Sequence, residues 1–136
     1  MAEETILTRE AKAELLRKAG RNPYPTKVDA GIGLGAYIAK YGALQPGETR
    51  DDTAIVAGRV VGIRNVGGVG FVDVMQEHNY LQLYLRKDKL GSEYDILFNA
   101  IDRGDWVWAS GRPCKTKRGE LSLLVDSWSM MSKAVK

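Results

Sequence analysis

Aromatic and polar side chains alternate with aliphatic ones in two neighbouring stretches of the sequence, GFVDVM and YLQLYLRK. The alternate positions include Phe71 in the first stretch, and in the second they are Tyr80, Gln82, Tyr84 and Arg86. Successive side chains of a β-strand point to opposite faces, so these residues would share one face of a sheet. Aromatic rings beside an amide and a guanidinium can stack on single-stranded bases and hydrogen-bond to their edges. Such a face is typical of a surface that binds unpaired nucleic acid.

The aliphatic residues of the same stretches indicate what lies behind that face. They are the small and branched side chains that fill a small β-barrel: Val72, Val74, Leu81, Leu83 and Leu85. Phe71, Gln82 and Tyr84 would then project outward. Ordinary packing explains the outward face as well, because an N-terminal helix can cover the two aromatic rings. Composition alone leaves both interpretations open.

Groups that do covalent or metal chemistry are scarce. His78 is the only histidine and is expected in a surface turn, while the single cysteine, Cys114, excludes an internal disulfide and a cysteine-based zinc site. No nucleophile–base pair can be assigned. The glycines of GIGLG, residues 31–35, match neither GxGxxG nor GxxxxGK[ST], so a short helix over 34–41 followed by a turn at Pro46–Gly47 is expected there. We expect no catalysis, no metal and no cofactor on this chain.

The composition is that of a globular domain. The chain has 136 residues, 44% of them hydrophobic and 27% charged, which is enough to build one core. Its 20 basic and 17 acidic residues give a net charge of +3, compatible with an acidic partner. The first residues lack the apolar run of a signal peptide and are too acidic for a transit peptide, so a cytoplasmic protein with no membrane partner is expected.

Elements that would position the polar face follow in a clear order. Thr8 can cap a helix over 9–19, and the two prolines of Arg21–Pro25 prevent its continuation. Beyond residue 53, short runs rich in Val, Ile and Leu alternate with turn residues. We expect strands at about 53–63, 68–75, 80–85, 106–112 and 121–130, and a helix over 92–101 capped by Ser92.

Three strands, a helix and two strands in this order predict a mainly β fold, a five-stranded OB-fold Greek-key barrel with the helix between strands 3 and 4. Gly58 and Gly62 fall where its long first strand would bend. Residues 51–136 would form the barrel and residues 1–50 an N-terminal helical extension and linker. OB-folds commonly bind through strands 2 and 3 and the loops after strands 1 and 4. Those loops hold Arg64 and the segment KTKRGE, which can equally be a solvated hairpin.

Several segments taken in order resemble the N-terminal anticodon-binding OB-fold domain of class II lysyl-tRNA synthetases. They are LLRKAGRNPYP, VAGRVVGIR, GFVDVMQ, YLQLYLRKDKLG, RGDWVWASG and KTKRGELSLLVDSWSMMSKAVK, and the match covers most of residues 13–136. Aspartyl- and asparaginyl-tRNA synthetases carry related OB-folds, but the segment KTKRGELS favours the lysyl branch.

The resemblance implies a role for the outward face. In that family a phenylalanine stacks on the central uridine of the anticodon, a glutamine hydrogen-bonds that base, an arginine assists, and a glutamate contacts a neighbouring anticodon base. The matching positions here are Phe71, Gln82, Arg64 and Glu120. Possible contacts to the RNA backbone fall on Arg17, Lys18, Arg21, Lys115, Lys117 and Arg118. The implied partner is the anticodon stem-loop of tRNA.

Two departures from the family limit what the resemblance implies. The turn Val66-Gly67-Gly68 replaces the polar residues that relatives often carry before the phenylalanine, so phosphate contacts are not expected in that turn. The family continues into a catalytic domain that activates lysine with ATP and magnesium, and it leaves open a homodimer of a full-length parent. Because the sequence ends at Lys136, we expect either an excised domain or a free-standing relative that binds single-stranded nucleic acid. A structural or dimerisation domain is the third alternative.

Overall fold

The computed structural model describes residues 32–132. The helix expected over 9–19, and with it Arg17, Lys18 and Arg21, lies outside the described residues.

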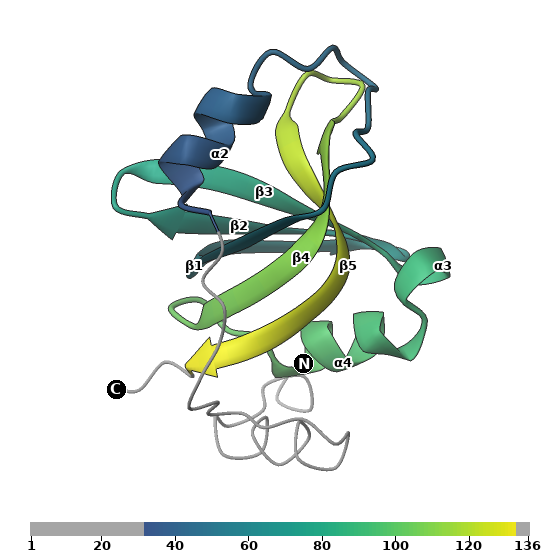
Figure 1. The fold of residues 1–136 in the computed structure, drawn as a ribbon. Helices are drawn as coiled ribbons and strands as arrows, with labels where there is room; N and C mark the ends of the chain where they lie inside the picture. The colour runs from purple at the N-terminus through teal and green to yellow at the C-terminus, as the bar shows by residue number, and fades with distance from the viewer. Residues whose placement is uncertain (1–31, 133–136) are drawn as a thin grey trace.

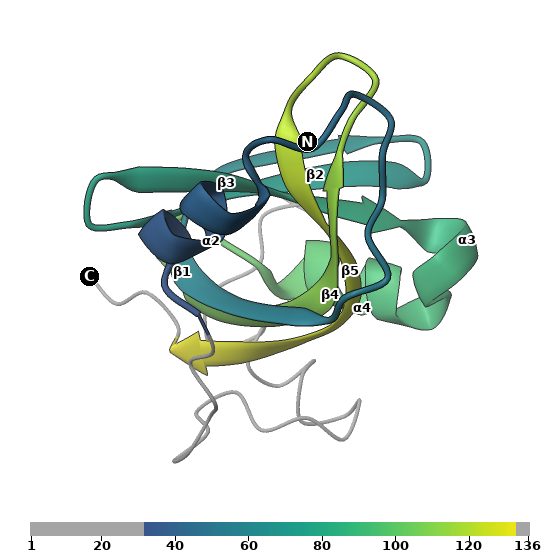
Figure 2. The same ribbon diagram turned by 45° about the horizontal axis from the view of Figure 1, so that its top comes forward.

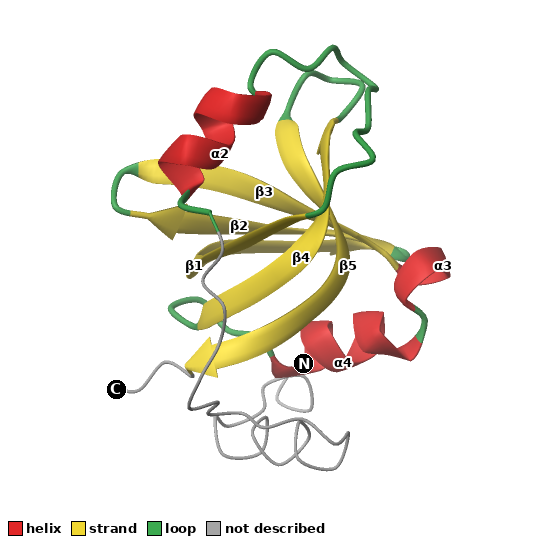
Figure 3. Ribbon diagram, in the orientation of Figure 1, coloured by secondary structure: helices red, strands yellow, loops and turns green. Residues whose placement is uncertain are grey.

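Five strands close into a barrel (Figures 1 and 3). They are β1 (Ala54–Val66), β2 (Val69–Gln76), β3 (Asn79–Arg86), β4 (Trp106–Lys115) and β5 (Leu121–Ser132). Around the barrel their order is β1-β2-β3-β5-β4, and β3 pairs with β5 in parallel while the other neighbouring strands pair antiparallel. The predicted OB-fold and its five strands are confirmed.

The aliphatic face of β2 and β3 lines the barrel interior, as the alternation predicts. Each of its members is at most 3% exposed: Val72, Val74, Leu81, Leu83 and Leu85. β1 bends where a glycine was expected to allow it, because its register with β2 shifts by one residue between Val60 and Gly62. The interior therefore fixes which side chains of β2 and β3 can reach the outside.

Two helices connect β3 to β4 and lie at one end of the barrel (Figure 1). They are α3 (Lys87–Leu90) and α4 (Ser92–Ala100). Tyr94 and Leu97 of α4 are buried in the core, and the ring of Phe98 packs so closely on Gly70 of β2 that a Cβ there would lie 2.2 Å from its Cζ. The predicted cap by Ser92 is wrong: Gly91 holds the N-cap position with a φ of +61°, which favours glycine, and no side chain caps the helix.

The part of the glycine cluster GIGLG that the structure describes, residues 32–35, serves packing. It leads into α2 (Leu34–Tyr41), the short helix expected there, which lies beside β3 (Figure 2). The side chain of Gln76 at the end of β2 caps this helix, since its Oε1 accepts a hydrogen bond of 2.9 Å from the Leu34 backbone N–H. A Cβ at Gly33 would lie 3.3 Å from the same oxygen. The helix terminus that a phosphate would need is thus occupied by a carboxamide.

Two turns expected from the sequence are present. His78 is exposed in the turn between β2 and β3, and Pro46 and Gly47 form a turn. No helix within residues 32–132 is long and apolar enough to cross a membrane. Within the same residues, no group of three or more histidine, cysteine or acidic side chains could hold a metal ion.

Candidate nucleic-acid interface

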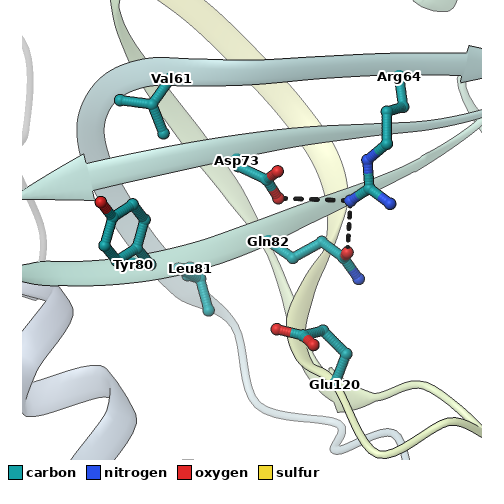
Figure 4. A pocket seen from close by; sticks show the side chains of 7 residues that line it. All are labelled: Val61, Arg64, Asp73, Tyr80, Leu81, Gln82 and Glu120. Atoms are coloured by element: carbon teal, nitrogen blue, oxygen red, sulfur yellow. Dashed lines mark hydrogen bonds and ion pairs between the residues drawn. The ribbon is translucent and has the colours of Figure 1, made fainter.

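A hollow of about 540 Å³ lies on the outer face of the barrel, across β1, β2 and β3 (Figure 4). Its lining consists of Val61, Arg64, Asp73, Tyr80, Leu81, Gln82 and Glu120. The strand register explains why these residues meet, because Gly62, Asp73, Gln82 and Ser122 are successive partners across β1, β2, β3 and β5. Gly62 leaves room for the carboxylate of Asp73, since a Cβ at that glycine would lie 2.9 Å from Oδ2.

Gln82 is the centre of a chain of hydrogen bonds in this hollow. Arg64 Nη2 donates to Gln82 Oε1 at 2.9 Å, and Gln82 Nε2 donates to Ser122 Oγ at 2.8 Å. Arg64 Nη2 also lies 3.5 Å from Asp73 Oδ1, an ion pair at the surface (Figure 4). The amide is held at both ends and is only 8% exposed.

Partner chemistry fixes which amide atom faces which neighbour. A guanidinium carries only donors, so the atom of Gln82 that contacts Arg64 must be the acceptor Oε1. Nε2 therefore faces Ser122, whose own hydroxyl proton is directed to the backbone carbonyl of Glu120 at 3.2 Å. An amide oxygen has two lone pairs and an amide nitrogen two protons. Gln82 consequently keeps one acceptor position and one donor position for a further partner.

Ser122 is anchored by its backbone as well as by its hydroxyl. The Tyr37 hydroxyl, on α2, donates a hydrogen bond of 2.7 Å to the Ser122 carbonyl, and both residues are fully buried. Burial, reinforced by the nearby Cys114 and Tyr41, raises the pKa of Tyr37 well above its ordinary value, so its hydroxyl remains a donor. The helix α2 thus holds the β5 residue that supports the Gln82 amide.

An aromatic row lies beside the hollow. Arg64, Phe71 and Tyr84 are direct neighbours across β1, β2 and β3. The Phe71 and Tyr84 rings are stacked, with centroids 5.4 Å apart and planes 11° from parallel. On the β1 side the guanidinium of Arg64 lies over the Phe71 ring, 4.9 Å from its centroid. A base that stacks on Phe71 from that side must therefore replace the guanidinium.

The turn between β4 and β5 borders the hollow. The carboxylate of Glu120 lies beside the Gln82 amide in Figure 4. Lys117 and Arg118 are exposed at the tip of the turn. Lys115 points elsewhere, because its Nζ donates a hydrogen bond of 2.7 Å to the Gly42 carbonyl at the end of α2. Two of the three basic residues predicted here are therefore presented to solvent.

The structure brings Arg64, Gln82 and Glu120 together around one hollow and places Phe71 next to it. Gln82 does leave the strand on the outward side, but it lies deeper than an exposed position, under Arg64 and against β5. Sequence reasoning missed Ser122. No local signal identifies it, because its contact with Gln82 depends on the parallel register of β3 and β5.

Comparison with known proteins identifies the family of the chain. The model of OB-fold nucleic acid binding domains of the tRNA anticodon type matches residues 54–131, so the chain belongs to that family. Lysine–tRNA ligases are among its relatives: the one from Saccharolobus solfataricus is 40% identical over 124 residues, which is 90% of this chain and 25% of the relative. Those from Magnetococcus marinus and Gloeobacter violaceus are 34% and 35% identical over 98% and 99% of the chain. The chain spans about a quarter of the length of these relatives.

The resemblance to lysyl-tRNA synthetases is confirmed. The chain is an OB-fold domain homologous to part of the lysine–tRNA ligases.

Proposed function

We propose that this domain binds the anticodon loop of a lysine tRNA and that the outer face of β2 and β3 receives the central uridine. One observation carries the proposal: the Gln82 amide, fixed in the hollow beside the Phe71 ring, keeps one donor and one acceptor position uncommitted. Uracil presents a donor at N3 and acceptors at O4 and O2, so a carboxamide can pair with its edge while an aromatic ring supports its face. Lysine–tRNA ligases as relatives support a lysine tRNA as the source of that base.

Stacking on Phe71 requires Arg64 to leave the ring, where the guanidinium also donates the hydrogen bond of 2.9 Å to Gln82 Oε1 and pairs with Asp73. The Arg64 side chain is 54% exposed, and its ion pair with Asp73 is 3.5 Å long. An exposed ion pair and a cation–π contact are each worth up to about 1 kcal/mol and a hydrogen bond about 0.5–1.5 kcal/mol. Stacking a base on an aromatic ring is worth about 1–3 kcal/mol, so it offsets the movement when the guanidinium leaves the ring face but keeps part of its polar contacts. The guanidinium displaced in this way stays close enough to contact the bound base or its phosphate.

The other contacts with RNA are proposed from the positions of the residues around the hollow. Glu120 lies on the β5 side of Gln82 and would contact the neighbouring anticodon base. Lys117 and Arg118, exposed in the β4–β5 turn, would contact phosphates, which adds affinity that falls with salt but little base preference. Activation of lysine, with ATP and magnesium, and dimerisation would belong to a longer parent protein, and this domain would contribute binding without chemistry.

The test compares two anticodon stem-loops that differ only in a central U or C, titrated at fixed salt. The U stem-loop is expected to bind at least about fivefold more tightly, since each mismatched base costs about 1–3 kcal/mol. Gln82→Ala should remove this preference, and Phe71→Ala should weaken binding. Gln45→Ala, the same change at an exposed position outside the hollow, is the matched control. Equal affinity of the unaltered protein for the two stem-loops would refute uridine recognition and leave a general binder of single strands.

A further inference from the structure

Ser122 has no assigned part in the recognition of a base, yet its hydroxyl is the second hydrogen-bond partner of the Gln82 amide. The residue is 0% exposed, on β5, and opposite Gln82 in the parallel β3–β5 ladder. Its Oγ lies 2.8 Å from Gln82 Nε2 and 3.2 Å from the Glu120 carbonyl. A buried side chain with both hydrogen-bonding functions committed in this way is a rigid support.

A carboxamide discriminates between uracil and cytosine only if it cannot turn over. Uracil presents an N3–H donor beside an O4 acceptor, while cytosine presents an N3 acceptor beside an N4–H donor. An amide that rotates freely by 180° about its last side-chain bond exchanges its own donor and acceptor, and so pairs with either base. The selectivity that we assign to Gln82 therefore needs a device that holds one orientation.

We propose that Ser122, acting with Arg64, is the positioning residue that locks the Gln82 amide in the orientation that accepts uracil and rejects cytosine. This inference rests on the function proposed above. Arg64 sets the orientation, because a donor-only guanidinium admits only Oε1. Ser122 stabilises it, because the proton of its hydroxyl is committed to the Glu120 carbonyl and the oxygen is left to accept from Nε2.

Turning the amide over would break both hydrogen bonds at once. It would place Nε2 against the Arg64 guanidinium, donor against donor, and Oε1 against a hydroxyl whose proton points to Glu120. Each net hydrogen bond corresponds to about a two- to tenfold change in an equilibrium constant. Arg64 alone is a weak lock, since it is 54% exposed and free to swing away when a base stacks on Phe71. The buried Ser122 is the part of the lock that persists during binding.

The experiment measures the ratio of affinities for the U and C stem-loops in three variants and a control. Ser122→Ala is expected to lower the preference for U about two- to tenfold, mainly by improving binding of the C stem-loop. Arg64→Met should also lower the preference for U. Because the Arg64 side chain is exposed, this substitution should leave the fold intact. The double variant should bind both stem-loops about equally. Ser127→Ala, the same change at an exposed position of β5, should leave the ratio unchanged.

The outcomes separate this inference from the function on which it rests. A lack of preference in the unaltered protein would overturn the proposed uridine recognition itself. A preference that survives in both single variants and in the double variant, with thermal unfolding confirming folded proteins, would overturn the lock alone. Improved binding of the C stem-loop is the specific sign, because a merely damaged protein would bind both stem-loops less well.

Discussion

Replacing Phe71 by leucine tests whether its ring supports a base. The variant keeps an apolar side chain on the outer face of β2 but removes the aromatic ring, and with it the stack with Tyr84 and the contact with Arg64. Stacking a base is worth about 1–3 kcal/mol, but the cation–π contact that the base replaces, about 0.5–1 kcal/mol, must be subtracted. With the middle value of each range, the net loss is about 1.3 kcal/mol, or about eightfold in affinity for the U stem-loop.

Fluorescence anisotropy of labelled stem-loops at low and at high salt is the suitable assay. The loss caused by Phe71→Leu should be nearly the same at both salt concentrations, because stacking does not depend on released counterions. Tyr84→Leu is the matched control, because it removes the stacking partner of Phe71 on the β3 side but leaves the face of Phe71 toward Arg64. This variant should lose less than about threefold in affinity. One aromatic pair is worth about 0.5–1.5 kcal/mol, and only part of that energy affects binding. Unchanged affinity of the folded Phe71→Leu protein, or a larger loss in Tyr84→Leu, would contradict the stacking role.

Three further predictions address the charged turn, the packing of the barrel end and the buried thiol. Replacing Lys117 and Arg118 by alanine should weaken binding of every stem-loop by a similar factor and reduce the slope of log K against log salt by about 0.7 for each phosphate that is no longer neutralised. Gly70→Ala should lower the free energy of unfolding by about 1–3 kcal/mol in urea titrations, because the new Cβ would overlap the Phe98 ring. Burial raises the pKa of Cys114 from 9.0 to about 11, so above pH 9 only the unfolded thiol ionises, and stability should fall between pH 9 and about 11. Cys114→Ala should lack that part of the fall.

The order of strands and helix was enough to predict the barrel, and the alternation of side chains predicted the face that carries the hollow. Leu81 and Leu83 are buried inside, so the residue between them had to leave β3 on the other side. The alternation along the strand predicts on which face of β3 a residue lies, but not how deeply its side chain is buried. Gln82 is nearly buried because Arg64 reaches across it and β5 lies against it, and both contacts come from strands remote in sequence.

Residues whose contacts are set by non-local pairing were not accessible from the sequence. Ser122 stands within the recognised segment KTKRGELS, but nothing in that segment says which β3 residue it will face. Lys115 shows how a competing acceptor affects such a candidate. Its position in a basic segment made it a possible RNA-backbone contact, and folding places its ammonium group on the carbonyl at the end of α2. Charge in a sequence identifies candidates, and the distance to a competing acceptor decides among them.

The position of the hollow couples recognition to closure of the barrel. β3 and β5 are joined by a short parallel ladder in which Gln82, Leu83 and Tyr84 face Ser122, Leu123 and Leu124. The first of these pairs supplies the amide and its support, and the next buries two leucines that are at most 3% exposed. The Tyr37 hydroxyl holds the same segment from α2. The β3–β5 ladder is the seam at which the barrel closes. If its hydrogen bonds opened, the Gln82 amide would be freed before the barrel unfolded, because the other strand pairs are longer. Base selectivity should therefore disappear at lower urea concentrations than the signal of global unfolding, and coincident loss of both would show that the seam opens only with the whole barrel.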